Sequence, residues 1–483
     1  MAGVKKNFAY QSVYQITTII LPLVTSPYVA RVLGAEGIGI YSYTYAVAYY
    51  FSLVALLGIS NHGNRVIASV RDDALQLKKT FSNLLIVHCV FSGIATVAYY
   101  GYFFFCITDD RLCAAIQGMW VLSSLFDVSW LFFGLEKFKL TVIRSTVIKI
   151  LTTICVFVFI RSSADVWKYC MIMAGGTLLS QLVLWPFVSQ YFDIRLVKWK
   201  RAKKHIKPLL MLFIPAIAVS LYKYMDKIML GIMTTKIQVG FYENAERAIN
   251  IPISVIGAFG TVMLPKMSNL VANDDEKGTK RYIMLSMEFV MCLTIAMAFG
   301  MAAVADDFSV LFWGQEFIKC GLLIKILAVS IIFVAFANIL RMQYLIPKKM
   351  DAAYIVSVFT GAIVNLIINS LLIGRFEAVG AALGTVVAEF SVCAVQSFYL
   401  RKELPIDIYI RKVFPFLGIG FLMYLALLAV GFLGIPSIVK IFLQIILGGL
   451  LYCGCCFVYF KKTKNEYFNS VIDRMLIRFN LKS

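Results

Sequence analysis

Apolar segments of roughly 20 residues recur along almost the whole chain and are separated by short charged stretches. An α-helix needs about 20 mostly apolar residues to cross the hydrocarbon core of a bilayer. In that medium a helix satisfies its own backbone hydrogen bonds within one segment. Hydrophobic residues make up 60% of the 483 residues and charged residues only 15%, so no soluble domain larger than a loop fits. The pattern predicts an all-α polytopic membrane protein.

Charge clusters, glycines and prolines bound about 14 such segments. We therefore predict a bundle of about 14 transmembrane helices. The expected spans are residues 8–33, 38–60, 80–107, 112–135, 140–160, 166–190, 208–233, 239–265, 283–304, 322–346, 352–373, 379–400, 413–433 and 436–460.

The basic residues alternate from one side of the predicted membrane to the other. If the N-terminus is cytoplasmic, most of the 46 lysines and arginines fall in internal segments, the longest of which runs from Arg195 to Lys207. Few fall in external segments: Arg111, Arg161, Lys168, Lys236, Lys319, Arg375 and Lys440. Basic residues concentrate in cytoplasmic loops of membrane proteins. We therefore expect cytoplasmic N- and C-termini, and the net charge of +20 requires no nucleic-acid partner.

A weak internal repeat relates the two halves of the chain. Leu33-Gly34 followed by Gly39-Ile40-Tyr41 corresponds to Leu230-Gly231 followed by Gly240-Phe241-Tyr242, six predicted helices later. Parallel repeats of this kind build two-lobed transporters. The glycines are interpreted as the tight external turn after the first helix of each half. The predicted domains are an N-terminal six-helix lobe (1–194), a basic cytoplasmic linker (195–207), a C-terminal six-helix lobe (208–402) and additional helices 13 and 14 with a basic cytoplasmic tail (403–483).

Ionisable side chains inside predicted spans are candidate functional residues, because they are costly in the membrane unless they face a partner or a watery cavity. The segment FYENAERAIN places Glu243, Glu246 and Arg247 on one stripe of its helix, and Lys223 and Asp226 lie in the preceding span. These side chains are expected to line a central cavity between the lobes. Two alternatives remain: Asp226 with Lys227, or Glu243 with Arg247, could simply neutralise each other as packing pairs.

Other basic residues within spans are Arg31, Lys149, Lys325 and Arg341. Lys149 lies nearest to the middle of its predicted span. Arg31, Lys325 and Arg341 lie near span ends, where a long basic side chain can instead reach the interface.

Three groups of residues receive a structural interpretation. The three histidines are isolated in the sequence and are interpreted as interfacial or packed, and most of the eleven cysteines lie in apolar runs as small apolar residues. Tyr41, Tyr45 and Tyr49 favour an aromatic belt at the membrane interface, with stacking on sugars as the alternative. The sequence contains no P-loop, metal-ligand cluster or nucleophile with a base at meaningful spacing. We expect no cofactor, no metal and no enzyme activity, as in a transporter without its own ATPase.

Several motifs together resemble a known family. They are KNFAYQSVYQITTIILPLVTSPYVARVLGAEGIGIYSY at the start, GISNHGNRVIASVRDD, WLFFGLEKFKLTVIRSTVIKI and YKYMDKIMLG. This combination resembles bacterial polysaccharide flippases of the Wzx type, in the polysaccharide transport family of the multidrug/oligosaccharidyl-lipid/polysaccharide exporter superfamily. The resemblance covers essentially the whole chain. It implies two six-helix lobes around a central cavity plus two C-terminal helices.

The resemblance also implies a cargo and a location. The cargo is an undecaprenyl-diphosphate-linked oligosaccharide repeat unit, flipped from the cytoplasmic to the outer leaflet of the bacterial cytoplasmic membrane for capsule, exopolysaccharide or O-antigen assembly. A gradient of H+ or Na+, or the membrane potential, drives such transport by alternating access. The partners implied are the lipid bilayer and the polymerase and glycosyltransferases of the same pathway.

In such flippases, cationic cavity residues engage the diphosphate, and Arg31 and Arg247 match that role by position. We expect the diphosphate to be held by a set of basic residues, namely Arg31, Lys149, Lys223, Arg247 and Arg341. The acids expected to titrate or to pair with them are Asp226, Glu243 and Glu246. For Arg31, a cavity position and an anchor at the outer interface remain alternatives.

Three other functions remain open from the sequence. A lipid II flippase differs in that its deletion is lethal, and a drug or cation antiporter of the same superfamily should present a net acidic cavity. A membrane-embedded glycosyltransferase or polymerase should carry a large extramembrane loop with clustered carboxylates. The longest loops of this chain are short and basic.

Overall fold

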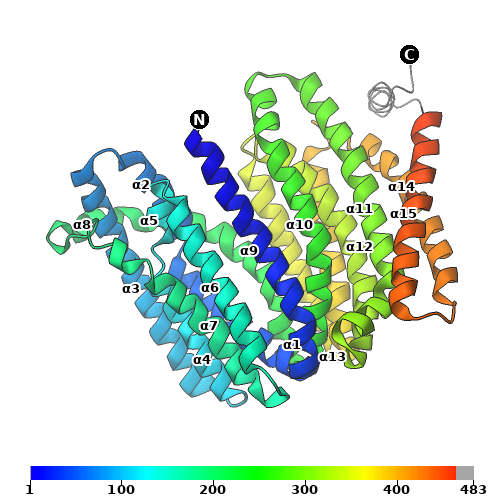
Figure 1. The fold of residues 1–483 in the computed structure, drawn as a ribbon. Helices are drawn as coiled ribbons and strands as arrows, with labels where there is room; N and C mark the ends of the chain where they lie inside the picture. Colours follow the sequence, from blue (N-terminus) through cyan, green and yellow to red (C-terminus); the bar gives the residue numbers. More distant parts are fainter. Residues whose placement is uncertain (1, 464–483) are drawn as a thin grey trace. The chain divides into compact units, whose positions relative to one another are not determined.

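The structure, a computed structural model, describes the backbone of residues 2–463 and the side chains of residues 17, 18, 20–214, 216–221 and 223–463. Within these residues every regular element is a helix, as predicted (Figure 1). Contacts divide the chain into two compact units. The first unit comprises Met1–Glu243 and Leu366–Ala381, and the second comprises Asn244–Asn365 and Ala382–Ser483.

Besides residues Leu366–Ala381 of α13 (Asp351–Leu400), the first unit contains nine α-helices and the start of a tenth. They are α1 (Ala2–Leu56), α2 (Ile59–Val70), α3 (Ala74–Cys106), α4 (Arg111–Leu125), α5 (Ser129–Gly134), α6 (Phe138–Phe159), α7 (Val166–Leu182), α8 (Trp199–Ala202), α9 (Ile206–Met233) and the first turns of α10 (Lys236–Ala272). Figure 1 shows α3, α4, α6 and α7 as neighbouring helices. One apolar core joins α2, α3 and α5, where Phe81 and Trp130 are both almost fully buried.

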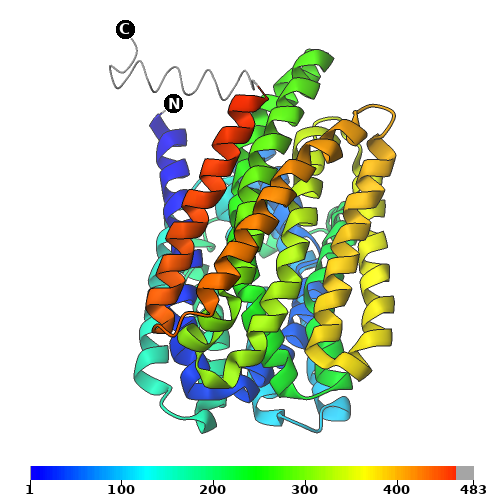
Figure 2. The ribbon, with the colours of Figure 1, turned by 90° about the vertical axis from the view of Figure 1, so that its right-hand side faces the viewer.

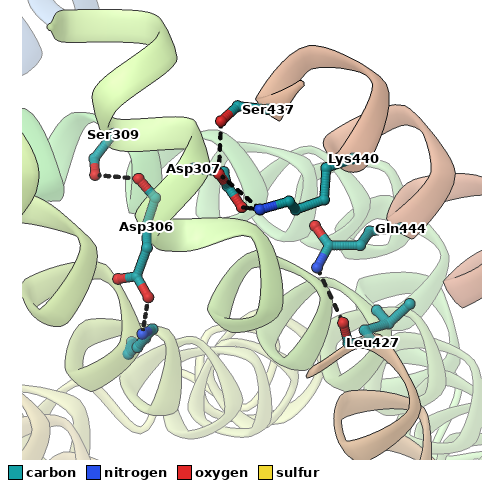
Figure 3. A network of polar contacts seen from close by, with 8 residues as sticks. Asp306, Asp307, Ser309, Leu427, Ser437, Lys440 and Gln444 are labelled. Atoms are coloured by element: carbon teal, nitrogen blue, oxygen red, sulfur yellow. Dashed lines mark hydrogen bonds and ion pairs between the residues drawn. The ribbon is translucent and has the colours of Figure 1, made fainter. Parts of the chain in front are cut away.

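The second unit contains the rest of α10 together with α11 (Glu276–Trp313), α12 (Lys319–Leu340), parts of α13 (Asp351–Leu400), α14 (Ile406–Gly431) and α15 (Ser437–Lys462). The last two helices lie side by side and pack against α11 (Figure 2). Asp307 of α11 accepts a hydrogen bond of 2.7 Å from Ser437 and pairs with Lys440 at 3.4 Å (Figure 3). The neighbouring Asp306 pairs with Lys325 of α12. The contacts of Asp307 fix the start of α15 to the end of α11, and the contact of Asp306 fixes α11 to α12.

Two of the helices are each two helices joined at a single residue. The joints are Gly34 in α1 (φ 69°) and Glu377 in α13 (φ 52°). The left-handed region suits glycine, which lacks a Cβ, whereas Glu377 is held there by its surroundings. Twelve helices of the described chain are long and apolar enough to cross a membrane. When the two arms of α1 and of α13 are counted separately, this agrees with the predicted number of spans.

Two predicted spans are interrupted in the structure. The span predicted at 112–135 is broken after Leu125, because the Asp127 carboxylate accepts a hydrogen bond of 2.9 Å from the Ser129 amide and so competes with the helical bonding. The span predicted at 322–346 ends as an α-helix at Leu340 and continues as one π-helical turn over Arg341–Leu345. Such turns are rare and often mark functional positions.

The predicted role of the glycines in a turn holds only for Gly34. Gly37 and Gly39 are helical, as are Gly231 and Gly240. A Cβ on Gly39 would lie 1.7 Å from the Lys236 carbonyl oxygen, and a Cβ on Gly240 would lie 1.9 Å from the Ala35 carbonyl oxygen. These two glycines therefore let the start of the second arm of α1 pack backbone to backbone against the start of α10.

Candidate functional site

A buried carboxylate, Asp226 of α9, forms the first part of the candidate site. Its side chain is 3% exposed. It accepts hydrogen bonds of 2.5 Å from the Tyr242 hydroxyl of α10 and from the Asn369 amide of α13. Three helices therefore converge on this acid. The two donors reach different oxygens of the carboxylate, so both oxygens of this buried side chain have a hydrogen-bond partner.

An ion pair lies one residue further along α9. The Lys227 ammonium is 2.6 Å from the Glu243 carboxylate, and about a tenth of each side chain is exposed. Glu243 also accepts a hydrogen bond of 2.5 Å from Ser42, on the second arm of α1. The alternatives drawn from the sequence, Asp226 with Lys227 and Glu243 with Arg247, did not include this pair between α9 and α10. Asp226 with its two donors and the Lys227–Glu243 pair with Ser42 are together called the polar cluster. This cluster connects α1, α9, α10 and α13.

The joint of α13 is tied to the same region. Gln238, in the first turn of α10, donates a hydrogen bond of 2.5 Å to the carboxylate of Glu377, the residue with positive φ. Positive φ is uncommon outside glycine and needs support from the surrounding structure. The bond to Gln238 supplies part of that support. It fixes the turn of α13 to the beginning of the helix that carries Tyr242 and Glu243.

A row of aromatic rings borders the polar cluster. Tyr41, Tyr45 and Tyr49 follow one another along α1, and Tyr49 packs on Tyr224 of α9 with ring centroids 4.1 Å apart. The ammonium of Lys227 lies 5.3 Å from the centre of the Tyr224 ring. These contacts show that the tyrosine row packs against the rings of other helices of the first unit. They also supply a cation–π contact to a buried lysine.

The remaining basic candidates of the first unit have different surroundings. Lys149 of α6 donates a hydrogen bond of 2.8 Å to the Thr18 hydroxyl of α1, which joins these two helices. Lys223 is exposed and lies 5.7 Å from the centre of the Tyr224 ring. Arg31 is also exposed, three residues before the joint at Gly34. None of the three side chains is fully buried.

Three predicted site residues belong to the second unit. Glu246 and Arg247 follow on α10 and are partly buried. Arg341 occupies the first position of the π-helical turn, with its guanidinium 5.7 Å from the centre of the Tyr354 ring. The structure thus brings Asp226 and Glu243 together in the first unit, while Glu246, Arg247 and Arg341 lie in the other unit.

Sequence reasoning missed several members of the cluster. Ser42, Tyr242 and Asn369 come from three different helices, and nothing in their local spacing connects them. One signal was available for Asn369, which follows Asn365 by four residues in an apolar span and so repeats a polar position on one helix face. Tyr242 could also have been singled out from the sequence, because it belongs to the internal repeat.

The histidines and cysteines were interpreted from the sequence as interfacial or packed side chains. His62 and His205, interpreted as isolated, are in fact joined by a hydrogen bond of 3.0 Å between ring nitrogens. His88 is buried. Among the described residues no group of three or more His, Cys, Asp or Glu side chains is arranged to hold a metal ion. In the same residues all eleven cysteines are free thiols.

Comparison with known proteins identifies the family. The family model described as polysaccharide biosynthesis protein matches residues 4–271. A protein of Shigella dysenteriae named as an O-antigen transporter is 21% identical over 389 residues, which cover 80% of this chain and 97% of that protein. A protein of Haloferax volcanii named as a low-salt glycan biosynthesis flippase is 27% identical over 248 residues, or 49% of this chain and 50% of that protein.

The fold also has a solved counterpart. The inward closed conformation of the lipid II flippase MurJ superposes with a TM-score of 0.77 at 14% sequence identity, covering 94% of this chain and 100% of that one. The named relatives are transporters and flippases, not enzymes. The matched segment exceeds half of the sequence, so this chain belongs to the polysaccharide biosynthesis protein family, in agreement with the resemblance of its motifs.

Proposed function

We propose that the protein is a flippase that moves an undecaprenyl-diphosphate-linked oligosaccharide repeat unit from the cytoplasmic to the outer leaflet of the bacterial cytoplasmic membrane. The observation that carries the proposal is a buried acid and a buried ion pair, held by four membrane helices, in a chain of the polysaccharide biosynthesis family. Buried charges inside a membrane protein are costly and mark transport pathways. The names of the relatives support the same cargo class.

The proposed orientation has both termini in the cytoplasm, on the strength of the alternating basic loops. The proposed architecture has two six-helix lobes, 1–194 and 208–402, joined by the basic linker 195–207 and followed by the additional helices of 403–483. Alternating access of the space between the lobes would carry the sugar across. The product would enter capsule, exopolysaccharide or O-antigen assembly, together with the glycosyltransferases and polymerase of that pathway.

The diphosphate would be held by basic side chains. A diphosphate carries negative charge that needs arginine or lysine opposite it wherever water is scarce. In the first unit the candidates are Arg31, Lys149 and Lys223, and in the second they are Arg247 and Arg341. Lys149 donates a hydrogen bond to the Thr18 hydroxyl, which orients its ammonium between α6 and α1.

The driving force would act on the acids. A proton or a sodium ion at Asp226, or at Glu243 or Glu246, would change the charge of the polar cluster and so the relative stability of two conformations. Asp226 fits best, because it combines burial with hydrogen-bond donors from two other helices. The membrane potential is the alternative source of energy.

The direct experiment is deletion of the gene followed by identification of the lipid-linked intermediate that accumulates in the inner leaflet. An oligosaccharide-diphospholipid should accumulate, and surface polysaccharide should be lost while the cells survive. Lethality with accumulation of lipid II would instead indicate the lipid II flippase. Active export of cationic drugs with normal polysaccharide would indicate the antiporter.

Single variants test the site. Arg247→Ala and Lys223→Ala should each abolish polymer production at unchanged protein level. Full polymer production in all the single variants of the basic candidates would refute their assignment to the diphosphate.

A further inference from the structure

An acidic residue, Glu389, lies at the middle of the second arm of α13. It follows the joint at Glu377 by 12 residues and precedes the end of the helix at Leu400 by 11 residues. At about 1.5 Å of rise per residue, Glu389 is about 17 Å from each end of the arm along the helix axis. The arm corresponds to the span predicted at residues 379–400. Glu389 therefore lies near the middle of the membrane.

No partner neutralises this acid. Within the described part of the chain, Glu389 has neither an ion pair nor a hydrogen bond. Every other acid of the predicted spans has a partner there; these acids are Asp127, Asp226, Glu243, Glu246 and Glu288. Glu389 thus differs from the acids that hydrogen bonds or ion pairs hold in place.

The immediate surroundings of Glu389 are apolar or neutral. The next residue, Phe390, packs against Phe333 of α12 with ring centroids 5.3 Å apart. Gln396, two turns further along the arm, donates a hydrogen bond of 3.2 Å to the Ser357 hydroxyl in the first arm of α13. The nearest titratable group on the same side of the helix is the Cys393 thiol, one turn away.

The charged and titratable groups of the two neighbouring segments lie towards the ends of those segments. In α12 they are Lys319, Cys320 and Lys325, and in the first arm of α13 they are Asp351, Tyr354 and Arg375. None of them is a partner of Glu389 in the described chain. A carboxylate in the membrane needs an opposite charge, hydrogen-bond donors or water. Glu389 has no such partner and is therefore protonated in this conformation.

We propose that Glu389 is a proton-binding residue of the transport cycle. It holds a proton in this conformation and releases it in another conformation, in which water reaches its side of α13. The proposal rests on the proposed flippase function and specifies a proton as a driving ion. It adds a proton site in the second unit to the acids of the polar cluster in the first unit.

The site suits a proton better than a metal ion. A proton is bound by a single carboxyl oxygen, whereas metal ions take several oxygen ligands. Within the described residues Glu389 belongs to no group of acids arranged to hold a metal ion. Thr385, Cys393 and Gln396 continue the polar side of the helix in both directions, at spacings of three, four or seven residues. Water entering along this side reaches Glu389 once the neighbouring helices separate.

The direct test is labelling with dicyclohexylcarbodiimide, an apolar reagent that adds to protonated carboxyl groups within membranes. The full-length protein in lipid vesicles is treated over a range of pH, digested and analysed by mass spectrometry. Label should be found on Glu389 and should decrease as the pH rises. Glu288 is the internal control, because its carboxylate pairs with Lys412 and should stay unlabelled. Absence of label on Glu389 at neutral pH, or equal labelling of Glu288, would overturn the proposal.

A reconstituted flipping assay with an imposed proton gradient tests the role in transport. Glu389→Gln keeps the side chain neutral, so it should lose the acceleration of flipping by the gradient and keep flipping without a gradient. Glu389→Asp retains a titratable carboxyl group and should retain the acceleration. Glu276→Gln, at an exposed acid of α11, is the matched control and should respond like the unmodified protein.

The two experiments separate this proposal from the proposed function. Label on Glu389 that decreases with rising pH, in a protein that flips nothing, would leave proton binding intact and refute the flippase. Flipping with the same gradient response in Glu389→Gln as in the unmodified protein would leave the flippase intact and refute the role of Glu389.

Discussion

Lys227 and Glu243 form an ion pair of 2.6 Å between α9 and α10, with only about a tenth of each side chain exposed. The pair is supported by Ser42 on one side and by the ring of Tyr224 on the other. Asp226, the residue before Lys227, turns to different partners, Tyr242 and Asn369. Asp226 and Lys227, which are adjacent on α9, therefore bind different side chains of the polar cluster.

Removal of one partner of the ion pair should destabilise the protein strongly. Glu243→Gln or Lys227→Met breaks a buried ion pair, which typically costs about 3–5 kcal/mol. The double variant should be more stable than either single variant, because no lone charge remains. The measurement is the thermal midpoint of the purified protein in detergent for all three.

The exposed pair of Glu276 and Lys280, at 3.5 Å, is the control. Glu276→Gln should cost less than about 1 kcal/mol, because solvent screens such a pair. Equal losses of stability at Glu243 and Glu276 would contradict the buried character of the first pair.

Side chains at the two close-packed glycines should not be tolerated. Gly39→Ala and Gly240→Ala place a methyl group against a carbonyl oxygen of the other helix, so the backbones must separate. Such overpacking commonly costs about 1–3 kcal/mol. The expected result is a lowered thermal midpoint and reduced flipping for both variants.

Gly93→Ala in α3 is the matched control, because nothing lies within 4 Å of a Cβ at that position. It should be neutral or slightly stabilising, since alanine favours a helix over glycine by about 1 kcal/mol. Normal activity of both Gly39→Ala and Gly240→Ala would argue against the close packing of α1 and α10.

If Asp226 is the proposed coupling site, loss of its charge should make flipping independent of an ion gradient. Asp226→Asn keeps the size of the side chain but removes the charge that a proton or sodium ion would neutralise. In proteoliposomes the variant should lose its response to imposed H+ and Na+ gradients. Asp72→Asn, at a fully exposed side chain, should keep the response. A gradient response that persists in Asp226→Asn would indicate that Glu243 or Glu246 is the coupling residue instead.

Acidification should loosen the contact between α2 and the segment before α9. The 3.0 Å hydrogen bond between His62 and His205 needs an unprotonated ring nitrogen as acceptor. Burial, and to a lesser extent repulsion from a charged His205, lowers the pKa of His62 to about 4, and burial also lowers the pKa of His205. The folded state thus takes up these protons less readily than the unfolded state, so stability rises with pH between the folded-state and the ordinary pKa values of the two histidines.

Hydrogen exchange of the α2 amides measures this effect. Exchange should accelerate as the pH falls from about 6.5, the ordinary pKa of histidine, towards the pKa of about 4 of His62 in the folded protein. The variant His62→Gln/His205→Gln should show a much smaller change after correction for intrinsic exchange. The same acceleration in both proteins would rule out the histidine pair as its cause.

The sequence alone determined the class of fold, because a membrane span depends on the length and polarity of a single segment. The apolar runs predicted the helices, and the motifs predicted the family. Local spacing was not enough to predict the interruption at Asp127 or the single joint at Gly34, since both depend on how individual side chains and backbone groups are satisfied.

Only the tertiary structure decided the partners within the site. Spacing along one helix suggested Glu243 with Arg247, and the structure adds a pair between helices, Lys227 of α9 with Glu243 of α10. Which side chains meet between two helices depends on their relative register, and here Gly39 and Gly240 allow α1 and α10 to approach closely. The polar residues were visible in the sequence as a group. Their pairing follows from helix packing, which joins residues far apart in the chain.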